Sequence, residues 1–265
     1  VHPLVLSVWG SDIVVCPEMS KTIKLFIKYA LKCADLVRIC DEIGKRLLIK
    51  LGCDERKIVV SPGCVDLKKF SPSARSEDLR KELGVDTCYS VLVARWWKPF
   101  YRVDVVIRAI PFVLKEEPNV KFILLGGGPL ELELKNLAKE LGVYENVIFV
   151  GRVPHEEMPK YLASVDIYVD PISDFQGDII RKGGSGIGST TREAMACGTP
   201  QVLSDKKSVK YGNWFQGLMY KQLDPEDMAK KIIQLLRDEK LRKEIGRKSR
   251  EAAEKMFDLN KNFLQ

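Results

Sequence analysis

Short apolar runs alternate with amphipathic segments in the first part of this chain. Apolar residues recur at helical spacing at 23, 26, 27, 30, 31 and 34. Strands are predicted at 3–8, 35–40 and 57–61, with helices at 20–34 and 41–51 between them. Gly52 follows the second helix, in a position where glycine commonly ends helices. A loop-like stretch at 62–76 then interrupts the pattern.

The same alternation resumes after this loop. Strands are predicted at 89–94, 120–125, 146–150, 166–169 and 200–203, and helices at 76–83, 102–117, 130–141, 155–164, 189–197, 225–237 and 239–256. Such regular alternation predicts an α/β fold, in which right-handed crossovers build a Rossmann-like parallel sheet. Ligands of these sheets bind beyond the carboxyl ends of the strands. The functional loops are therefore expected after residues 8, 94, 125, 150 and 169.

Composition narrows the class of protein. A chain of 265 residues can bury a substantial core, and it contains no run of about 18 apolar residues that would predict a transmembrane helix. Seven cysteines without a C-x-x-C pair, and only two histidines, argue against a disulfide framework or a zinc site. They favour a reducing, cytoplasmic compartment. The net charge of +7 is scattered among acidic residues, so no nucleic-acid partner is expected.

Four sequence blocks that follow one another in order suggest the chemistry. The first is VWGSDI at 8–13, and the second is IVVSPGCVDLKKFSP at 58–72. The third, between 91 and 153, contains VLVAR, VDVVIRA, FILLGGGPLELELKNLAKELG and VIFVGRV. The fourth spans 186–205 and includes GSTTREAMACGTPQV. As an ordered set, these blocks resemble the GT-B-fold retaining glycosyltransferases of family 4, also called group 1.

The resemblance implies two Rossmann-like parts of unequal size. Residues 73–252 are expected to form a complete donor domain, whose parallel sheet binds a nucleotide sugar. Residues 1–72 match only the last third of the family's N-terminal, acceptor-side domain, and 253–265 form a tail that is expected to return toward it. The chain thus resembles a glycosyltransferase that lacks most of the N-terminal domain. A second polypeptide is one candidate source of the missing part.

The resemblance also implies a metal-independent reaction in which cations hold the donor diphosphate. Negative charge grows on the departing phosphate, so fixed cations stabilise the transition state more than the ground state. Arg95 follows VLVA and matches the catalytic arginine of the family. Either Lys98 or Arg102 matches the lysine that follows it, because this loop is one residue longer. A cationic surface loop without a ligand is the alternative interpretation for all three.

Donor-binding positions are implied in two glycine-rich turns and after one strand. They are Gly127, Gly128, Arg152, Val153, Ser185, Gly186, Ile187, Gly188 and Ser189. Glycines before a helix leave N–H groups available to a phosphate. Glu193, in EAMA, matches the glutamate that holds the ribose in the family and is counted with the catalytic residues. A tight strand–helix turn explains Gly127 and Gly128 equally well.

The long loop at 170–188 departs from the family pattern. The family has a glutamate eight positions before Glu193, and here Ser185 stands in that position. Asp174 and Asp178 are candidates to replace the missing acid. The departure puts the identity of the transferred sugar and full activity in doubt, but not nucleotide binding.

The N-terminal portion holds the acceptor-side candidates, Gly10 and Asp12, for which helix capping is the alternative role. His155 is interpreted as a surface residue, and no histidine catalyst is expected. Helix 20–34 is basic and apolar by turns. This composition suits a lipid-linked acceptor or peripheral attachment to a membrane, although core packing is the favoured explanation.

The sequence therefore predicts a hexosyltransferase that uses a UDP- or GDP-type sugar, with retention and without a metal or other cofactor. The expected acceptor is a saccharide or a lipid-linked molecule. One alternative is the nucleotide-sugar-binding subunit of a split glycosyltransferase, or a catalytically impaired homologue. A less favoured alternative is a GT-B epimerase.

Overall fold

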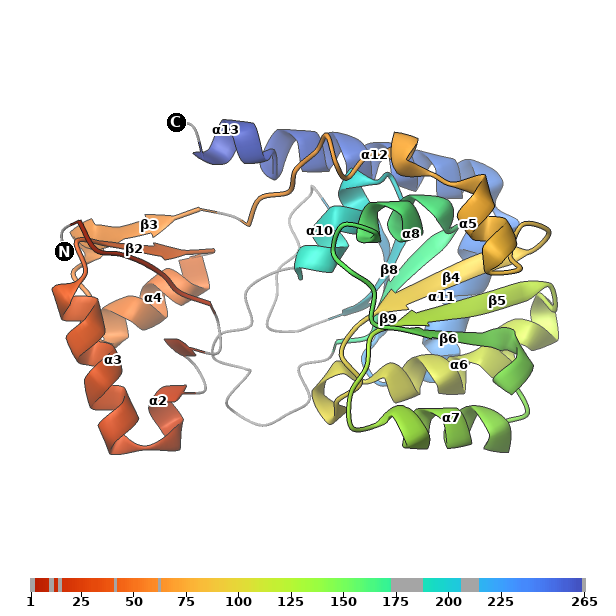
Figure 1. The fold of residues 1–265 in the computed structure, drawn as a ribbon, viewed down its shortest axis with the longest axis horizontal. Coiled ribbons are helices and arrows are strands. Elements are labelled where there is room, and N and C mark those ends of the chain that lie inside the picture. Colours follow the sequence, from red (N-terminus) through yellow and green to blue (C-terminus); the bar gives the residue numbers. More distant parts are fainter. Residues whose placement is uncertain are drawn as a thin grey trace.

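Two parallel β-sheets of different size organise the chain (Figure 1). The computed structural model describes residues 3–9, 12–13, 16–40, 42–61, 63–172, 188–205 and 215–263. The smaller sheet has three strands and the larger has six. Helices alternate with the strands of both sheets, which confirms the expected α/β class.

The smaller sheet is built from the N-terminal residues. Its elements are β1 (Val5–Ser7), α2 (Cys16–Met19), α3 (Lys21–Cys33), β2 (Leu36–Ile39), α4 (Glu42–Lys50) and β3 (Ile58–Val60). Its strands pair in the order β1-β2-β3, all parallel. Helix α3 begins at a capped turn, because Ser20 Oγ accepts the N–H of Ile23 at 3.1 Å. Val37, Leu31 and Leu48 pack together in a small core between the sheet and these helices.

The larger sheet follows a linker. Its strands are β4 (Tyr89–Ala94), β5 (Val120–Leu125), β6 (Val147–Gly151), β7 (Ile167–Asp170), β8 (Gln201–Asp205) and β9 (Leu218–Lys221). Its helices are α5 (Glu77–Glu82), α6 (Val103–Glu116), α7 (Glu131–Glu140), α8 (Met158–Ser164), α10 (Ser189–Ala196), α11 (Pro225–Arg237), α12 (Glu239–Met256) and α13 (Leu259–Phe263). Short 3₁₀ turns lie at Glu55–Lys57, Pro72–Ala74, Pro99–Tyr101 and Tyr144–Asn146.

The strands of the larger sheet are ordered β6-β5-β4-β7-β8-β9 and are all parallel. The order reverses between β4 and β7, which is the switch point where such sheets bind ligands. Side chains alternate between two cores, since successive residues of a strand face opposite sides. Val91 and Val93 belong to one core, and Leu92 between them belongs to the other.

The C-terminal residues run back toward the smaller sheet (Figure 1). Helix α12 passes along one side of the larger sheet, and the chain then pairs with the linker. Val65 donates its N–H to Phe257 O at 2.7 Å, and Leu259 donates to Val65 O at 3.1 Å. Arg250 of α12 reinforces the junction by donating to the carbonyl of Phe70 at 2.8 Å and to that of Ala196 at 2.6 Å. The linker, α10 and α12 are thereby held together.

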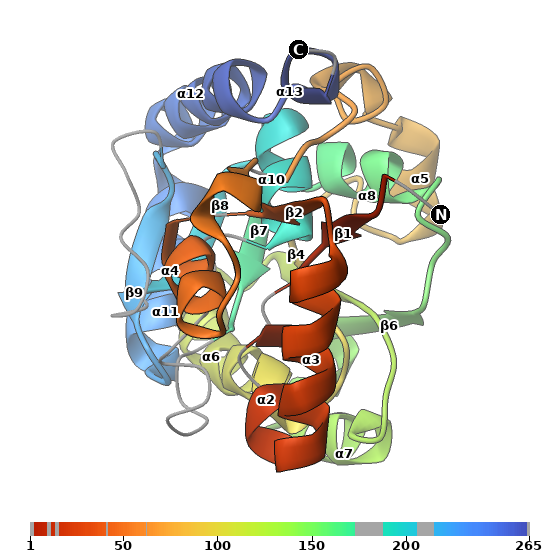
Figure 2. The same cartoon turned by 90° about the vertical axis from the view of Figure 1, so that its left-hand side faces the viewer.

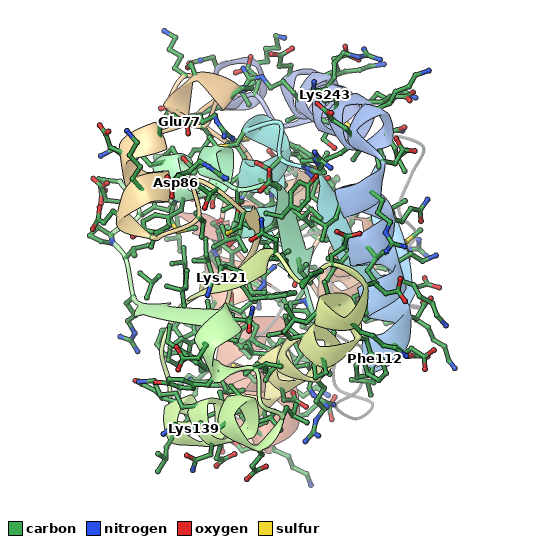
Figure 3. The ribbon with its side chains drawn as sticks, turned by 90° about the vertical axis from the view of Figure 1, so that its right-hand side faces the viewer. Glu77, Asp86, Phe112, Lys121, Lys139 and Lys243 are labelled. Atoms are coloured by element: carbon green, nitrogen blue, oxygen red, sulfur yellow. The ribbon has the colours of Figure 1, made fainter. Side chains whose placement is uncertain are left out.

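Charged side chains cover the end of the larger sheet that lies away from the smaller one (Figure 3). The labelled Glu77, Asp86, Lys121, Lys139 and Lys243 project outward from separate elements. Acids and bases are interspersed there, as the sequence predicts for solvated faces. In the part of the chain that the structure describes, no helix combines the length and the apolarity that crossing a bilayer requires.

Three features of the fold differ from the sequence prediction. Strand β9 and the short helices α2 and α13 are not predicted, and the helix expected at 155–164 begins only at Met158. The expectation that helix 20–34 is packed in the core is wrong for part of its surface. Its inner residue Leu31 is buried, but Phe26 and Ala30 are exposed. Helical spacing indicates the period of a helix and does not identify which apolar residues meet the sheet.

Candidate functional site

A cavity of about 470 Å³ opens at the switch point of the larger sheet, and we call it the central cleft. It is lined by Ala94, Arg95, Trp96, Tyr101, Leu125, Gly126, Gly127, Arg152, Val153, His155, Met158, Ser189, Thr190 and Glu193. These residues end β4 and β5, follow β4, β5 and β6, or lie at the start of α8 and in the first half of α10. The loops expected after residues 94, 125 and 150 therefore do meet in one place.

Arg95 lies at the base of the central cleft, immediately after β4. Its Nε donates to Asp170 Oδ1 at 3.0 Å, and its terminal nitrogen pairs with the other carboxylate oxygen. The two side chains are only 9% and 3% exposed. Burial disfavours the charged guanidinium, but attraction to Asp170 outweighs it, so the pKa of Arg95 lies above its usual value. Arg95 therefore stays positively charged, and it is already paired with Asp170.

Asp170 joins Arg95 to the helix beside the cleft. Its carboxylate also accepts the Thr191 hydroxyl at 3.0 Å and the Ile172 N–H at 3.2 Å. Gly188, before α10, lies so close that a Cβ atom there would come within 2.8 Å of the Arg95 guanidinium. The guanidinium thus lies against the N-terminal end of α10, where backbone N–H groups favour an anion.

The glycine-rich turn after β5 has a clear packing role. Gly126 and Gly128 adopt φ values of +139° and +155°. A Cβ atom on Gly126 would lie 1.9 Å from the Arg95 carbonyl oxygen, and one on Gly128 would lie 2.5 Å from that of Trp97. Only glycine fits where the β4 and β5 loops cross. Gly127 differs, because it lines the cleft beneath Arg152.

Arg152 and Trp96 form a stacked pair at the cleft wall. The Arg152 guanidinium carbon lies 4.5 Å from the centre of the Trp96 ring, and the indole is 48% exposed. Across the described ranges, Arg152 makes no ion pair or side-chain hydrogen bond. The stacking contact holds the guanidinium in place, and its five N–H donors remain available to an anionic ligand.

Glu193 extends from α10 into the opposite side of the cleft. Its Oε1 atom lies 2.9 Å from His155 Nε2, and the carboxyl side chain is 12% exposed. The His155 ring is 59% exposed and packs against Phe70 of the linker, with ring centres 5.3 Å apart. The pair links the turn after β6 with α10. His155 is thus a surface residue by exposure, as expected, but it also contacts the candidate ribose-binding glutamate.

The two alternative lysine equivalents lie outside the central cleft. Arg102 has a left-handed backbone with φ of 49° and forms an ion pair with Asp104 at 2.9 Å. It lines a separate cavity of about 590 Å³ between α6 and α7. Lys98 is exposed, and its Nζ atom lies 4.7 Å from the Trp96 ring centre. Lys98 is therefore close to the cleft wall, whereas Arg102 faces elsewhere.

Several predicted positions lie outside the described residues. They are Gly10, Ser185, Gly186 and Ile187, together with the candidate acids Asp174 and Asp178. Asp12 is described, and its carboxylate accepts the Trp9 N–H at 2.8 Å within its own turn. Val153 and Ser189 line the central cleft, whereas Gly128 is not among the residues that line it and packs against the Trp97 backbone.

Sequence reasoning missed Asp170, His155 and Trp96. Asp170 directly follows the strand predicted at 166–169, at the carboxyl edge of the sheet, so its position alone was a usable signal. The contact between His155 and Glu193 joins residues 38 positions apart, which no local pattern predicts.

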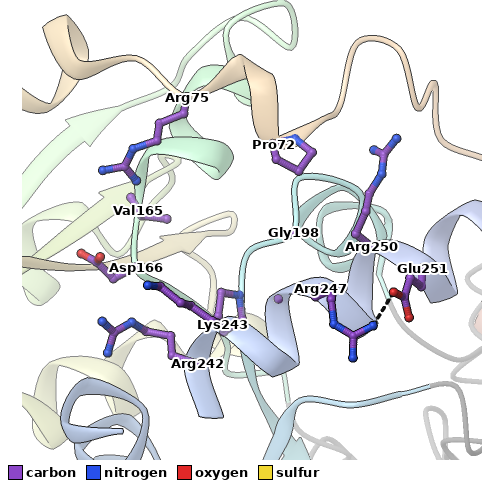
Figure 4. Close-up of a pocket in the computed structure, with 12 residues that line it drawn as sticks. Pro72, Arg75, Val165, Asp166, Gly198, Arg242, Lys243, Arg247, Arg250 and Glu251 are labelled. Carbon is purple, nitrogen blue, oxygen red and sulfur yellow. Dashed lines mark hydrogen bonds and ion pairs between the residues drawn. The ribbon is translucent and has the colours of Figure 1, made fainter. Parts of the chain in front are cut away.

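A second, larger cavity of about 600 Å³ lies between α12 and the linker (Figure 4). Its lining includes Arg75, Arg242, Lys243, Arg247 and Arg250. These cations already have partners: Arg247 pairs with Glu251 at 2.5 Å, and Arg242 donates to helix-terminal carbonyls of α11 at 2.7 and 2.9 Å. This cavity therefore has a structural explanation, and the central cleft is the better candidate site.

The central cleft lies within a region that matches a known family. Residues 76–252 match the family model "Glycosyl transferases group 1". The chain therefore belongs to this family, as its sequence blocks predict.

Curated relatives support the assignment. The chain is 30% identical over 194 residues to a GDP-mannose-dependent monoacylated alpha-(1-6)-phosphatidylinositol monomannoside mannosyltransferase of Corynebacterium glutamicum, an alignment that covers 70% of this chain and 48% of the relative. It is 28% identical over 186 residues to the alpha-monoglucosyldiacylglycerol synthase of Streptococcus pneumoniae, covering 68% of this chain and 40% of the relative. The chain thus spans about half the length of these relatives or less.

Solved structures confirm the GT-B fold. Anabaena HepE, in complex with UDP and glucose, superposes with a TM-score of 0.79 at 22% identity, covering 99% of this chain and 70% of HepE. Sucrose-phosphate synthase of Thermosynechococcus elongatus superposes with a TM-score of 0.77 at 21% identity, covering 99% of this chain and 66% of the synthase.

Proposed function

We propose that this group 1 glycosyl transferase binds a nucleotide sugar in the central cleft and transfers the sugar to an acceptor. The observation that carries the proposal is the convergence of Arg95, Arg152 and Glu193 on one cleft at the switch point of a parallel sheet. Two cations and one carboxylate are the groups that a diphosphate and a ribose diol require.

The diphosphate is assigned to the side of the cleft that holds Arg95, Arg152 and the start of α10. During transfer the bond from the anomeric carbon to the diphosphate oxygen breaks, and a bond to an acceptor hydroxyl oxygen forms. The acceptor proton leaves to the departing phosphate or to solvent. Arginines suit this step, because the N–H donors of the planar guanidinium match phosphate oxygens. Their hydrogen bonds to the phosphate become stronger as negative charge accumulates on it.

The ribose is assigned to Glu193, with His155 as its positioning residue. A carboxylate can accept hydrogen bonds from both hydroxyls of a diol. The His155 ring restricts the carboxylate to one orientation before a ligand arrives, which lowers the entropy lost on binding. The nucleobase of the donor is assigned to the neighbourhood of Arg152 and Val153, beside the exposed face of Trp96.

The nucleotide is proposed to be of the UDP or GDP type. The Corynebacterium relative is described as GDP-mannose-dependent, and HepE was solved with UDP. A saccharide or a lipid-linked molecule is proposed as acceptor, since both mannosyl and glucosyl lipid enzymes are among the relatives. Gly10 and Asp12 remain the proposed acceptor-side residues.

Retention of configuration and independence from metal are proposed from the four sequence blocks. The cationic side chains of the cleft support metal independence, because they supply the charge that a divalent ion would otherwise bring. A cytoplasmic location is proposed from the cysteines: all seven lie among the described residues and are free thiols.

Two specific observations favour a second candidate function. Arg95 is neutralised by Asp170 and almost fully buried, so it has less charge to offer a phosphate than an unpaired arginine. Ser185 also replaces the family's first glutamate. Both features favour a nucleotide-sugar-binding subunit, or an impaired homologue, that needs a second polypeptide for catalysis.

A transfer assay distinguishes the two candidates. The purified chain is incubated with UDP- and GDP-sugars and with saccharide and lipid acceptors, in the presence of EDTA. Products are detected by mass, and their anomeric configuration is assigned by NMR. We expect an α-linked product from an α-linked donor, lost in Glu193→Ala and kept in Lys139→Ala on the outer face of α7. Donor binding without transfer or hydrolysis would instead support the binding subunit.

A further inference from the structure

We infer that the Tyr101 hydroxyl donates a hydrogen bond to the diphosphate of the donor in the central cleft. The inference rests on the proposed function and adds a phosphate-binding residue to the same site. Tyr101 is among the residues that line the cleft, whereas Lys98 and Arg102, the two candidates from the sequence, are not. The loop after β4 therefore presents a neutral hydroxyl to the ligand where a cation was expected.

The backbone after β4 explains why Tyr101, and not its neighbour, enters the cleft. Residues Pro99–Tyr101 form a 3₁₀ turn, in which the Tyr101 N–H donates to Lys98 O at 3.0 Å. Arg102 ends this turn with a left-handed backbone and also precedes the first residue of α6. Its Nε and one terminal nitrogen donate to the Asp104 carboxylate at 3.0 and 2.9 Å. The left-handed residue thus sends two adjacent side chains to different cavities.

Tyr101 approaches the cleft from the side of the sheet opposite to Glu193. Helix α10 lies above the strands of the larger sheet and α6 lies below them in two perpendicular views (Figure 1 and Figure 2). Their apolar faces accordingly belong to different cores. A ligand at this switch point therefore meets Glu193 on one side and Tyr101 on the other.

Tyr101 also lies near the Arg95 guanidinium. Burial disfavours the charged form of Arg95, but nearby Asp170, Tyr168 and Tyr101 together keep its pKa above the usual value. Asp170 accepts from Nε and one terminal nitrogen of Arg95. Among the described residues, the other terminal nitrogen and the Tyr101 hydroxyl have no hydrogen-bond partner. Two unused donors thus face the same end of the cleft.

A phenol hydroxyl beside a guanidinium suits the phosphate that departs during transfer. The hydroxyl can donate one hydrogen bond to a phosphate oxygen. This bond becomes stronger as negative charge accumulates on that oxygen. Tyr101 keeps its proton throughout, so it stabilises the departing phosphate without taking part in proton transfer.

The ring of Tyr101 has a separate, structural explanation. It packs against the core between the sheet and α6, and it meets the Phe100 ring edge to face, with ring centres 5.1 Å apart. Packing requires the ring but not the hydroxyl. Tyr101→Phe keeps the ring and removes only the donor, so it separates the two roles.

Calorimetry with diphosphates and monophosphates tests the inference. UDP, GDP, UMP and GMP are each titrated, in the presence of EDTA, into the parent, Tyr101→Phe and Glu193→Ala. The matched control is Tyr89→Phe at the opposite end of β4, where the ring lies 5.3 Å from the Arg242 guanidinium carbon. Thermal unfolding confirms that each variant is folded.

We expect Tyr101→Phe to bind the preferred diphosphate roughly tenfold or more weakly, because it loses a hydrogen bond to a charged group. It should bind the matching monophosphate like the parent, since the distal phosphate that carries the sugar is absent. Tyr101→Lys, which returns an N–H donor to the same position, should restore most of the lost affinity. Tyr89→Phe should bind both nucleotides like the parent.

Two outcomes would overturn this inference alone. In the first, Glu193→Ala weakens diphosphate binding but Tyr101→Phe does not. In the second, Tyr101→Phe weakens diphosphate and monophosphate binding equally, which would show an indirect effect on the cleft. If the parent bound none of the four nucleotides, the proposed function and this inference would fail together.

Discussion

His155 and Glu193 meet across the central cleft, with His155 Nε2 2.9 Å from Glu193 Oε1. One residue comes from the turn after β6 and the other from α10. The contact fixes the orientation of the carboxylate that we assign to the ribose. It also gives the half-exposed His155 ring a positioning role in the proposed site.

His155→Ala should weaken nucleotide binding by about threefold to tenfold, because the half-exposed ring only positions the carboxylate and a typical hydrogen bond contributes about 1 kcal/mol. Glu193→Ala should reduce binding more, since it removes the ribose ligand itself. Isothermal calorimetry with the preferred nucleotide measures both. His155→Gln, whose amide can still donate, serves as the control and should bind nearly like the parent. If His155→Ala bound the nucleotide as tightly as the parent, His155 would have no positioning role.

The Arg95–Asp170 pair should be sensitive to the loss of one partner. Asp170→Ala leaves a buried guanidinium unpaired and should lower the free energy of unfolding by about 3–5 kcal/mol. Arg95→Met/Asp170→Leu should be more stable than either single variant, because no buried charge remains. Urea unfolding measures the three variants. Glu251→Ala, which breaks an exposed pair with Arg247, is the control and should cost about 1 kcal/mol or less. If Asp170→Ala and Glu251→Ala lowered the free energy of unfolding by similar amounts, burial of the Arg95–Asp170 pair would not determine its sensitivity.

Three cations near the β4 loop should differ in their effects on nucleotide affinity. Arg152→Ala should weaken binding by at least about tenfold, because charge-assisted hydrogen bonds contribute about 1.5–3 kcal/mol. Lys98→Ala should have a smaller effect, since its ammonium group lies outside the lining. Arg102→Ala should bind like the parent, because its partner is Asp104. If Arg102→Ala weakened nucleotide binding more than Arg152→Ala, then Arg102 rather than Arg152 would be the second cation that binds the diphosphate.

The glycine turn provides a matched comparison between two positions. Gly126→Ala should lower stability by at least about 3 kcal/mol, because its Cβ atom would overlap the Arg95 carbonyl and its φ is positive. Gly142→Ala has a positive φ but no neighbour within 4 Å, so it should cost only about 1–2 kcal/mol. Thermal unfolding separates the two. Equal losses would mean that the crossing of the two loops is not tight.

Cys197 should make stability depend on alkaline pH. Burial raises the pKa of its thiol from 9.0 to about 12, and the nearby Glu193 charge adds to this effect. The folded state therefore keeps a proton that the unfolded state releases. This contribution to stability is complete below pH 9 and is lost as the pH rises toward about 12.

Alkylation followed by mass mapping tests this assignment directly. At a pH near 9, the exposed Cys33 should react with iodoacetamide and Cys197 should not. Cys197→Ala should show a shallower loss of stability with rising pH than the parent. Rapid labelling of Cys197 in the folded chain would contradict its raised pKa.

Much of the fold could be predicted from the sequence, because the evidence for it is local. The strand at 89–94 and the helix at 239–256 follow from apolar runs and helical spacing, and the structure places them at Tyr89–Ala94 and Glu239–Met256. Strand β9 was missed because GLMYKQ has neither clear alternation nor a long apolar run. Its partner β8 stabilises it through pairing, which is a tertiary effect.

The candidate site was only partly predictable. Arg95, Arg152 and Glu193 were identified by their places in sequence blocks, and the structure brings them to one cleft. Which cation enters that cleft depends on the backbone path after β4, where the left-handed turn at Arg102 directs its side chain to Asp104. A pattern of residue types does not contain that information. The exposure of Phe26 and Ala30 on α3 was likewise not the favoured prediction, because helical spacing does not identify which apolar residues meet the sheet.

Calorimetry with UDP, GDP, ADP and their common sugars, in the presence of EDTA, tests whether the central cleft binds a nucleotide sugar. Arg152→Ala and Glu193→Ala are measured beside the parent and the Lys139→Ala control. We predict metal-independent binding to one type of nucleotide, weakened in both cleft variants and unchanged in the control. No binding to any nucleotide, or binding that neither cleft variant weakens, would show that the central cleft is not a nucleotide-sugar site.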